Sequence, residues 1–189
     1  MKFDFTTLNT GGGVHPFVAE KGVKDPSIIS FSVAEMRLNL APAIAEGMHH
    51  CVDVGCFGYA PPEKERYDKA VAAWMARRHH WNVSMDTCTQ TTGVVTAMGI
   101  AIRALTEPGD GVIIQTPVYP PFAGSVRNNG RTLIENPLKC VDGVYTMDFE
   151  DLEEKAAHAK MLLLCSPHNP VGRVWTEEEL KKLEAERSR

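Results

Sequence analysis

The sequence predicts an α/β protein with a mostly parallel sheet, and three observations support this class. The stretches Gly111–Gln115 and Met161–Cys165 are apolar and too short for helices, which is typical of strands buried on both faces of a parallel sheet. A further strand is expected at Arg131–Pro137. Segments with helical periodicity alternate with these strands, as right-handed crossover connections between parallel strands require.

The first third of the chain is expected to form an arm followed by a helix. Residues 1–27 are rich in glycine, threonine and proline, which favours an extended arm. A short strand is expected at Ile28–Val33. The side chain of Asn39 can cap a helix that has Pro42 in its first turn and ends near Cys51.

Two helices and a short strand are predicted next. An amphipathic helix should span Glu63–His79. The face expected to join the core carries Tyr67, Ala70, Val71, Trp74 and Met75. Val83–Thr91 is interpreted as a short strand and turn. The helix over Val94–Leu105 is apolar on nearly every side and should be buried.

The second half contains clear local signals for helix and strand ends. A helix over Ala123–Asn129 should end at Gly130. Asp142-Gly143 indicates a hairpin turn. Asp148 can cap a helix that reaches Ala159, and the residues 176–179, Thr-Glu-Glu-Glu, form a capping box at the start of a last helix.

Composition limits the possible functions. The chain has 189 residues, enough for one domain or one and a part, and 43% of them are hydrophobic, which excludes disorder. The net charge of −4 argues against nucleic acid or an anionic membrane as a partner. No stretch is long enough for a membrane helix, and no signal peptide is visible. The five cysteines form no Cys-x-x-Cys and are interpreted as reduced thiols of a cytoplasmic protein.

Histidine and glycine clusters do not indicate a metal or a dinucleotide site. His49, His50 and Cys51 are adjacent on a predicted helix and therefore point in different directions. The glycines at 11–13 follow no strand and open no helix, which argues against a nicotinamide dehydrogenase. No metal site is expected.

Two loops that follow strands carry candidate ligand-binding side chains. Asn169 lies between two prolines, so its amide can be held in place at low entropic cost. Tyr119 lies in a similar proline-rich loop and can stack on a planar ring. Ligands of open α/β sheets bind beyond the carboxyl ends of the strands, where both residues are expected. The alternative is that both loops are ordinary connections.

Two other stretches add candidates. The free amides of Gly93, Val94 and Val95 at a helix N-terminus would suit a phosphate, although a simple buried helix start is the alternative. Tyr59 lies in a loop punctuated by glycines and prolines, where it is either a site residue or a packing residue.

The motifs together resemble a known enzyme family. The segment 166–175, SPHNPVGRVW, is similar to the S-P-x-N-P-x-G-x-x-W segment of fold-type-I pyridoxal-phosphate (PLP) enzymes. The segments GCFGY at 55–59, GVV at 93–95 and EPGDGVIIQTPVYPPF at 107–122 narrow the resemblance to the MalY/PatB group of the class I/II aminotransferase family. It covers about residues 1–180.

This resemblance implies a fold and a set of roles. The fold would be an incomplete three-layer α/β/α PLP-dependent transferase-like large domain, with an arm and first helix at 1–50 and the N-terminal part of the PLP-binding domain at 51–189. Asn169 would bond the pyridine hydroxyl oxygen and Tyr119 would stack on the ring. Gly93, Val94 and Val95 would hold the phosphate, and Tyr59 would reach the phosphate of a partner subunit in a homodimer.

The resemblance also implies an activity and what the chain lacks for it. The parent reaction would be β-elimination from a cysteine S-conjugate such as cystathionine, releasing a thiol, pyruvate and ammonia. The family's Asp-Glu-x-His and Ser-x-Ser-Lys segments have no match here, and the chain's lysines lie in polar helices, turns or tails. We therefore name no catalytic residue and expect no lyase activity from this chain alone. Residues 34–37, Ala-Glu-Met-Arg, also depart from the family's usual Ala-Asp-Met-Asp.

Two alternatives remain open at this point. One is an aminotransferase, because the same fold supports transamination. The other is a non-catalytic protein that pairs with a full-length homologue through a retained dimer surface.

Overall fold

The computed structural model describes residues 4, 6–7, 38–58 and 63–187. The chain forms two compact units, and the boundary between them lies between Val71 and Ala72. The predicted strand at Ile28–Val33 and the candidate residue Tyr59 lie outside the described residues. No helix in the described ranges combines the length and the apolar character needed to cross a bilayer.

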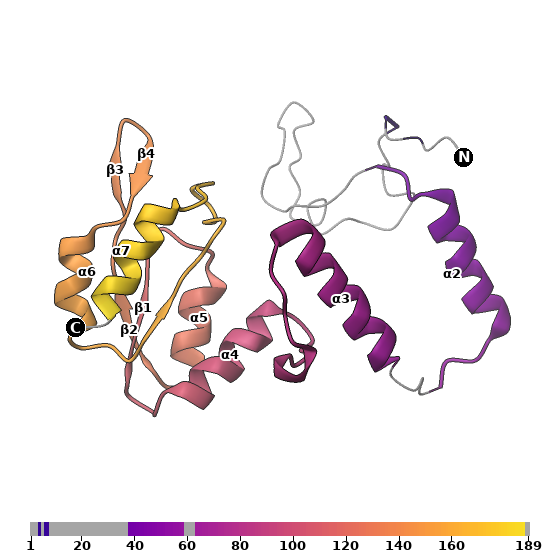
Figure 1. The fold of residues 1–189 in the computed structure, drawn as a ribbon, viewed down its shortest axis with the longest axis horizontal. Helices are drawn as coiled ribbons and strands as arrows, with labels where there is room; N and C mark the ends of the chain where they lie inside the picture. The colour runs from indigo at the N-terminus through magenta and orange to yellow at the C-terminus, as the bar shows by residue number, and fades with distance from the viewer. Residues whose placement is uncertain (1–3, 5, 8–37, 59–62, 188–189) are drawn as a thin grey trace, which may run out of the picture. The chain divides into compact units, whose positions relative to one another are not determined.

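The first unit contains helix α2, Pro42–Val54, and the start of α3, Lys64–His79 (Figure 1). Pro42 lies in the first turn of α2, as expected, but the capping role predicted for Asn39 is wrong. The helix begins after Ala41, and no side chain caps it. Proline stabilises this start without a cap because it has no amide hydrogen to satisfy. The helix ends at Gly55, which has a φ of 68°.

Helix α3 forms where the sequence predicts it, but its apolar face is not part of a core. None of its residues is buried, and Tyr67 and Trp74 are 50% and 51% exposed. The guanidinium groups of Arg77 and Arg78 lie 5.6 and 5.4 Å from the centroid of the Trp74 ring. Periodicity produces an apolar face, but only a second surface can bury it, so the predicted core position of this face is wrong.

The second unit is built on a three-stranded parallel sheet in the order β2-β1-β5. Strand β1, Gly111–Ile114, pairs with β2, Thr132–Glu135, and with β5, Met161–Leu163. Strands β3, Lys139–Val141, and β4, Val144–Thr146, form a separate antiparallel hairpin. The predicted hairpin turn is confirmed, because Asp142 and Gly143 connect these strands with φ values of 50° and 78°.

Helices cover both sides of this sheet. Figure 1 shows α4, Val94–Leu105, and α5, Pro121–Asn128, on one side of it, and α6, Phe149–Ala156, and α7, Glu177–Arg187, on the other. This arrangement confirms the predicted α/β class with a parallel sheet. The predicted strand at 83–91 is wrong: a 3₁₀ helix, Met85–Thr87, lies there instead. The amide and the hydroxyl of Thr87 both donate to the carbonyl of Ser84, and such local bonds compete with strand pairing.

Alternate residues of β1 pack into different layers. Val112 and Ile114 form a core cluster with Ile102 of α4 and Val126 of α5. The next face carries Gly111 and Ile113. A Cβ added at Gly111 would lie 2.3 Å from the carbonyl oxygen of His158, so the turn that follows α6 packs directly against that glycine.

The expectation that the helix over 94–105 is buried on every side is wrong. Only Ile102 is buried, whereas Val94 and Leu105 are 78% and 71% exposed. The helix packs on α5 and the sheet through one face, and a single contact face buries only about a third of a helix's circumference.

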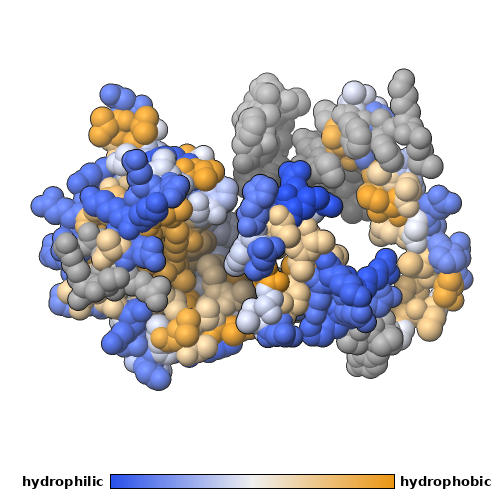
Figure 2. All heavy atoms as spheres, viewed as in Figure 1, coloured by the Kyte–Doolittle hydropathy of each residue, from blue (hydrophilic) through white to orange (hydrophobic). Residues whose placement is uncertain are grey.

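A second cluster holds the last helices to the hairpin. It contains Leu138, Met147 and Trp175, with Phe149 of α6 and Leu183 of α7 packed against it. Two exposed apolar side chains flank the turn of the hairpin: Val141 and Val144 are 68% and 58% exposed. Figure 2 shows orange atoms directly beside the blue tip at this end of the molecule.

A buried polar network ties the carboxyl ends of β1 and β2 to α6. The amide of Gln115 donates to Asn136, whose own amide donates to Asp151 at 2.7 Å. Lys155 pairs with the same carboxylate at 2.7 Å. Hydrogen bonds from Lys155 and then from Asn136 hold the pKa of Asp151 below its usual value. Asp148 accepts the amide hydrogen of Asp151, which confirms its predicted role as a helix cap.

Candidate cofactor site

The candidate site begins where two neighbouring parallel strands end. Strands β1 and β5 are paired in parallel, so their carboxyl ends lie at the same edge of the sheet. Each strand runs into a loop that contains a cis X-Pro bond, Thr116–Pro117 after β1 and Ser166–Pro167 after β5. These two loops carry Tyr119 and Asn169.

A hydrogen bond joins the two loops directly. Nε2 of His168 lies 2.9 Å from the carbonyl oxygen of Pro117, a contact between residues 51 positions apart. The imidazole is 1% exposed. Tyr119 follows Pro117 by two residues, and Asn169 follows His168 directly. The structure therefore brings the loops of both candidate residues together at this edge.

The Asn169 loop is closed by two short backbone bonds. The amide of His168 donates to the carbonyl of Arg173, and the amide of Gly172 donates back to the carbonyl of His168, both at 2.7 Å. Gly172 adopts a φ of 76°, which favours glycine over any residue with a side chain. Asn169 lies in this turn and is exposed, and its carboxamide has no hydrogen-bond partner among the described residues. The carboxamide is thus available to a ligand.

Trp175 fixes the return of this loop. Its ring is 3% exposed, and its indole nitrogen donates to the carbonyl of Cys165 at 2.9 Å. The His168 ring meets it edge-on, with centroids 5.4 Å apart. The tryptophan follows the loop in sequence and bonds to Cys165 before the loop, so it ties the two ends of the loop together.

Arg173 connects the loop to helix α7. Its guanidinium makes two bonds to the carboxylate of Glu179, at 2.8 and 3.0 Å. Thr176 and Glu179 exchange bonds at 2.8 and 3.2 Å, which confirms the predicted capping box. Burial raises the pKa of Glu179, but the bonds from Arg173 and Thr176 outweigh it, so this pKa lies below its usual value.

Helix α4 precedes β1, is joined to it by the turn at 106–110, and packs against α5 beside the sheet. Its N-terminus carries the candidate residues Gly93, Val94 and Val95. Among the described residues, no hydrogen bond joins these three to either strand-end loop.

This helix start offers open space and uncapped amides. No side chain caps α4, so the amides of Val94 and Val95 keep their hydrogens free of an intrahelical or side-chain acceptor. A Cβ built at Gly93 would meet no atom within 4 Å. The backbone there is extended, and the surroundings of Gly93 leave room for a group such as a phosphate.

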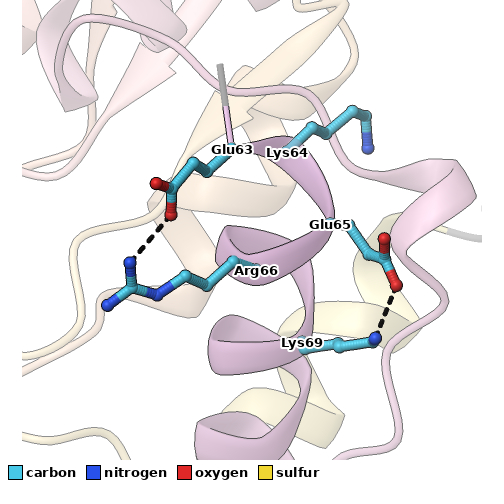
Figure 3. A pocket seen from close by; sticks show the side chains of 5 residues that line it. All are labelled: Glu63, Lys64, Glu65, Arg66 and Lys69. Atoms are coloured by element: carbon cyan, nitrogen blue, oxygen red, sulfur yellow. Dashed lines mark hydrogen bonds and ion pairs between the residues drawn. The ribbon is translucent and has the colours of Figure 1, made fainter. Parts of the chain in front are cut away.

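A shallow hollow on the described surface contains none of these residues. It is lined by Glu63, directly before α3, and by residues of the first turns of that helix, Lys64, Glu65, Arg66 and Lys69 (Figure 3). The ion pairs drawn there join residues three and four positions apart on one helix, at 2.8 and 2.5 Å. They are surface pairs of a helix and suggest no chemistry. Among the described residues, no group of three histidine, cysteine or carboxylate side chains could hold a metal ion.

Sequence reasoning did not identify the residues that support the site. The sequence indicates only that His168 lies in a loop and that Trp175 is part of a motif. The distant partner of His168, the Pro117 carbonyl, leaves no mark in local sequence. A histidine between two prolines, next to the candidate asparagine, was the one available signal.

Comparison with known proteins places this arrangement in a family. Residues 26–188 match the aminotransferase class I and II family, and the chain belongs to it. Among individual relatives, it is 47% identical over 153 residues to cystathionine beta-lyase PatB of Bacillus subtilis, and 33% identical over 169 residues to protein MalY of Escherichia coli. The predicted resemblance to the MalY/PatB group is thus confirmed.

Solved structures give the same result for the fold. Cystalysin from Treponema denticola, whose structure contains pyridoxal 5′-phosphate, matches 98% of this chain with a TM-score of 0.85 and 40% identity. The PLP-bound C-S lyase from Staphylococcus hominis matches 82% of it with a TM-score of 0.74 and 26% identity. The predicted PLP-dependent transferase-like fold is confirmed.

The chain matches only part of each relative. The match to PatB includes 80% of this chain but only 39% of PatB. The match to MalY includes 87% of this chain but only 43% of MalY. The chain covers 49% of cystalysin and 40% of the Staphylococcus lyase.

Proposed function

We propose that this chain supplies the phosphate-binding and ring-binding part of a PLP site in a carbon–sulfur β-lyase of the cystathionine β-lyase type. The observation that carries the proposal is the contact between the two strand-end loops, which brings the Tyr119 and Asn169 loops together at the carboxyl ends of β1 and β5. Relatives named as cystathionine β-lyases support the reaction type.

Each candidate residue has a role that its surroundings suit. The exposed Asn169 carboxamide would donate to the pyridine hydroxyl oxygen. The Tyr119 ring, 43% exposed, would lie against a face of the cofactor ring. The amides of Val94 and Val95 would bind the phosphate, and Gly93 would allow it to come close. Tyr59 would reach a phosphate across a homodimer.

Bound PLP would supply an electron sink for loss of the α-proton and of the β-thiol group from a cysteine S-conjugate. The residues of this chain would hold and orient the cofactor. Two lysines of the described part of the chain are held by carboxylates: a hydrogen bond to Asp148 raises the pKa of Lys139, and Lys155 is paired with Asp151. A protonated, paired amine is a poor nucleophile, so the chain alone should lack lyase activity.

Binding and turnover can be tested separately. PLP titrated into the purified chain and followed by cofactor absorbance should show saturable binding. Asn169→Ala should weaken it about tenfold, the effect of one charge-assisted hydrogen bond. Asn128→Ala is the matched control, because Asn128 is exposed at the end of α5. Equal affinities for both variants would contradict the assigned role of Asn169.

Turnover is measured with PLP and L-cystathionine, by pyruvate release. No pyruvate is expected from the chain alone. Pyruvate release together with borohydride fixation of the cofactor on one lysine would overturn the expected inactivity. Formation of glutamate from 2-oxoglutarate and an amino acid would instead favour an aminotransferase.

A further inference from the structure

We propose that His168 is a positioning residue that sets the spacing between the Asn169 carboxamide and the Tyr119 ring by donating its Nε2 hydrogen to the Pro117 carbonyl. This inference rests on the proposed PLP site. His168 would touch neither cofactor nor substrate, but it would determine how well Asn169 and Tyr119, which contact the cofactor, are aligned.

The acceptor determines which ring nitrogen carries the hydrogen. A carbonyl oxygen can only accept, so the contact at 2.9 Å requires a hydrogen on Nε2 of His168. In the neutral ring Nδ1 is then an acceptor. It is buried and has no hydrogen-bond partner among the described residues.

That unpartnered nitrogen argues against a purely structural role. A buried polar atom without a partner costs free energy, and an apolar ring of similar size would fill the same space without that cost. The imidazole satisfies only one of its two nitrogens here. The bond that it does make is the side-chain link between the two strand-end loops.

The surroundings of the ring make the link rigid. The imidazole is 1% exposed and lies edge-on to Trp175, with an interplanar angle of 84°. The backbone amide and carbonyl of His168 are also both bonded within its own loop. A displacement of Pro117 relative to this ring is therefore transmitted to the neighbouring residues.

Short stretches of backbone carry that displacement to the site. Asn169 is one residue from His168, and Tyr119 is two residues from Pro117, so ~4 and ~7 Å of chain separate the link from each site residue. Without the link, the strand pairing of β1 with β5 would remain, but it ends before either loop begins.

Two substitutions separate the hydrogen bond from the ring. In His168→Gln the side-chain amide nitrogen lies the same number of bonds from Cβ as Nε2, so it can donate to Pro117. In His168→Phe the ring and its contact with Trp175 remain, but the donor is lost. We expect His168→Gln to bind PLP within about threefold of the natural chain and His168→Phe to bind about tenfold more weakly.

A double substitution tests positioning rather than general stability. If His168 acts through Asn169, Asn169→Ala should cost much less in the His168→Phe background than in the natural chain. Additive effects, or equal PLP affinities of the Gln and Phe variants, would overturn the inference.

NMR tests the link independently of cofactor binding. Long-range ¹H–¹⁵N correlations should show a hydrogen on Nε2 of His168, and the Tyr119 amide shift should change in His168→Phe but not in His168→Gln. A hydrogen on Nδ1 alone, or an unchanged Tyr119 amide in both variants, would overturn the inference. Failure of the natural chain to bind PLP would overturn the proposed function, while these spectra would still decide whether the loops are coupled.

Discussion

Helix α2 and strand β1 both have apolar residues at regular intervals, but only the strand buries them. In α2, Ile44, Met48 and Val52 are spaced four residues apart and are 53%, 61% and 63% exposed. All four residues of β1 are buried: α4 and α5 cover one side, and the turn after α6 packs against Gly111 on the other. The difference shows that a periodic pattern produces an element, whereas a second surface turns it into a core. The candidate site is built on the part of the chain that has this core.

The largest difference is expected from core truncation. Ile114→Ala removes a buried side chain from the cluster beside Ile102 and should cost about 2–5 kcal/mol of unfolding free energy. Met48→Ala in α2 should cost less than about 0.5 kcal/mol. Urea denaturation followed by far-ultraviolet circular dichroism measures both costs, because this signal reports the helices of both units. Comparable costs at both positions would remove the distinction between the two regions.

Two glycines should respond to alanine with opposite signs. At Gly111 the new Cβ would lie 2.3 Å from the His158 carbonyl oxygen and 2.6 Å from Ile134, so overpacking should cost about 1–3 kcal/mol or more. At Gly47, inside α2, nothing lies within 4 Å, and alanine should stabilise the helix by about 0.5–1 kcal/mol. Denaturation of the first variant and helical circular dichroism of the second measure these effects. A stabilised Gly111→Ala protein would contradict the packing of the turn after α6 on β1.

Acid should weaken the second unit through Asp151. Its pKa is lowered in the folded chain by Lys155 and Asn136, so the unfolded state takes up a proton first as the pH falls. The stability gained is present above the ordinary value of 3.8 and is lost below it, as the pH falls towards the folded pKa. Asp151→Asn should therefore flatten the pH dependence of the stability of the second unit below about pH 4, as measured by the change in Trp175 fluorescence on unfolding. Asp86→Asn, at an exposed position, serves as the control and should leave the dependence unchanged.

The smallest difference concerns two ion pairs. Lys69 and Glu65 of α3 are 75% and 82% exposed, so Lys69→Ala should change stability by at most about 0.5 kcal/mol. Glu179 is 19% exposed and is held by two bonds from Arg173, so Glu179→Gln should cost about 1–2 kcal/mol. Thermal unfolding at low and high salt measures both, and salt should abolish only the α3 effect. The reverse ranking would contradict the anchoring of the Asn169 loop to α7.

Features that depend on neighbouring residues could be predicted from the sequence, whereas features that depend on distant packing partners could not. The caps at Asp148 and Thr176 depend on residues three positions apart, and the short apolar runs of β1 and β5 are intrinsic to those segments. Whether the α3 face and the helix at 94–105 are buried depends on packing partners that the sequence does not name, and there the prediction of burial was wrong. The strand expected at 83–91 does not form, because Thr87 makes local hydrogen bonds to Ser84 instead.

The candidate site divides in the same way. The stiff loops carrying Tyr119 and Asn169 were visible in the sequence because proline marks them. The bond from His168 to Pro117 was not, since it joins residues 51 positions apart. The local sequence showed which side chains could bind a ligand, and only the fold showed what aligns them.

The central claim is that α4 and the two strand-end loops bind one phosphorylated ring. It is tested most directly by ¹H–¹⁵N spectra of the 189-residue chain during titration with PLP. The Val94 and Val95 amides, the Tyr119 amide and the Asn169 carboxamide should all shift along a single saturation curve, with inorganic phosphate moving only the first two. Unchanged signals at these residues, or separate curves for the helix and the loops, would contradict it.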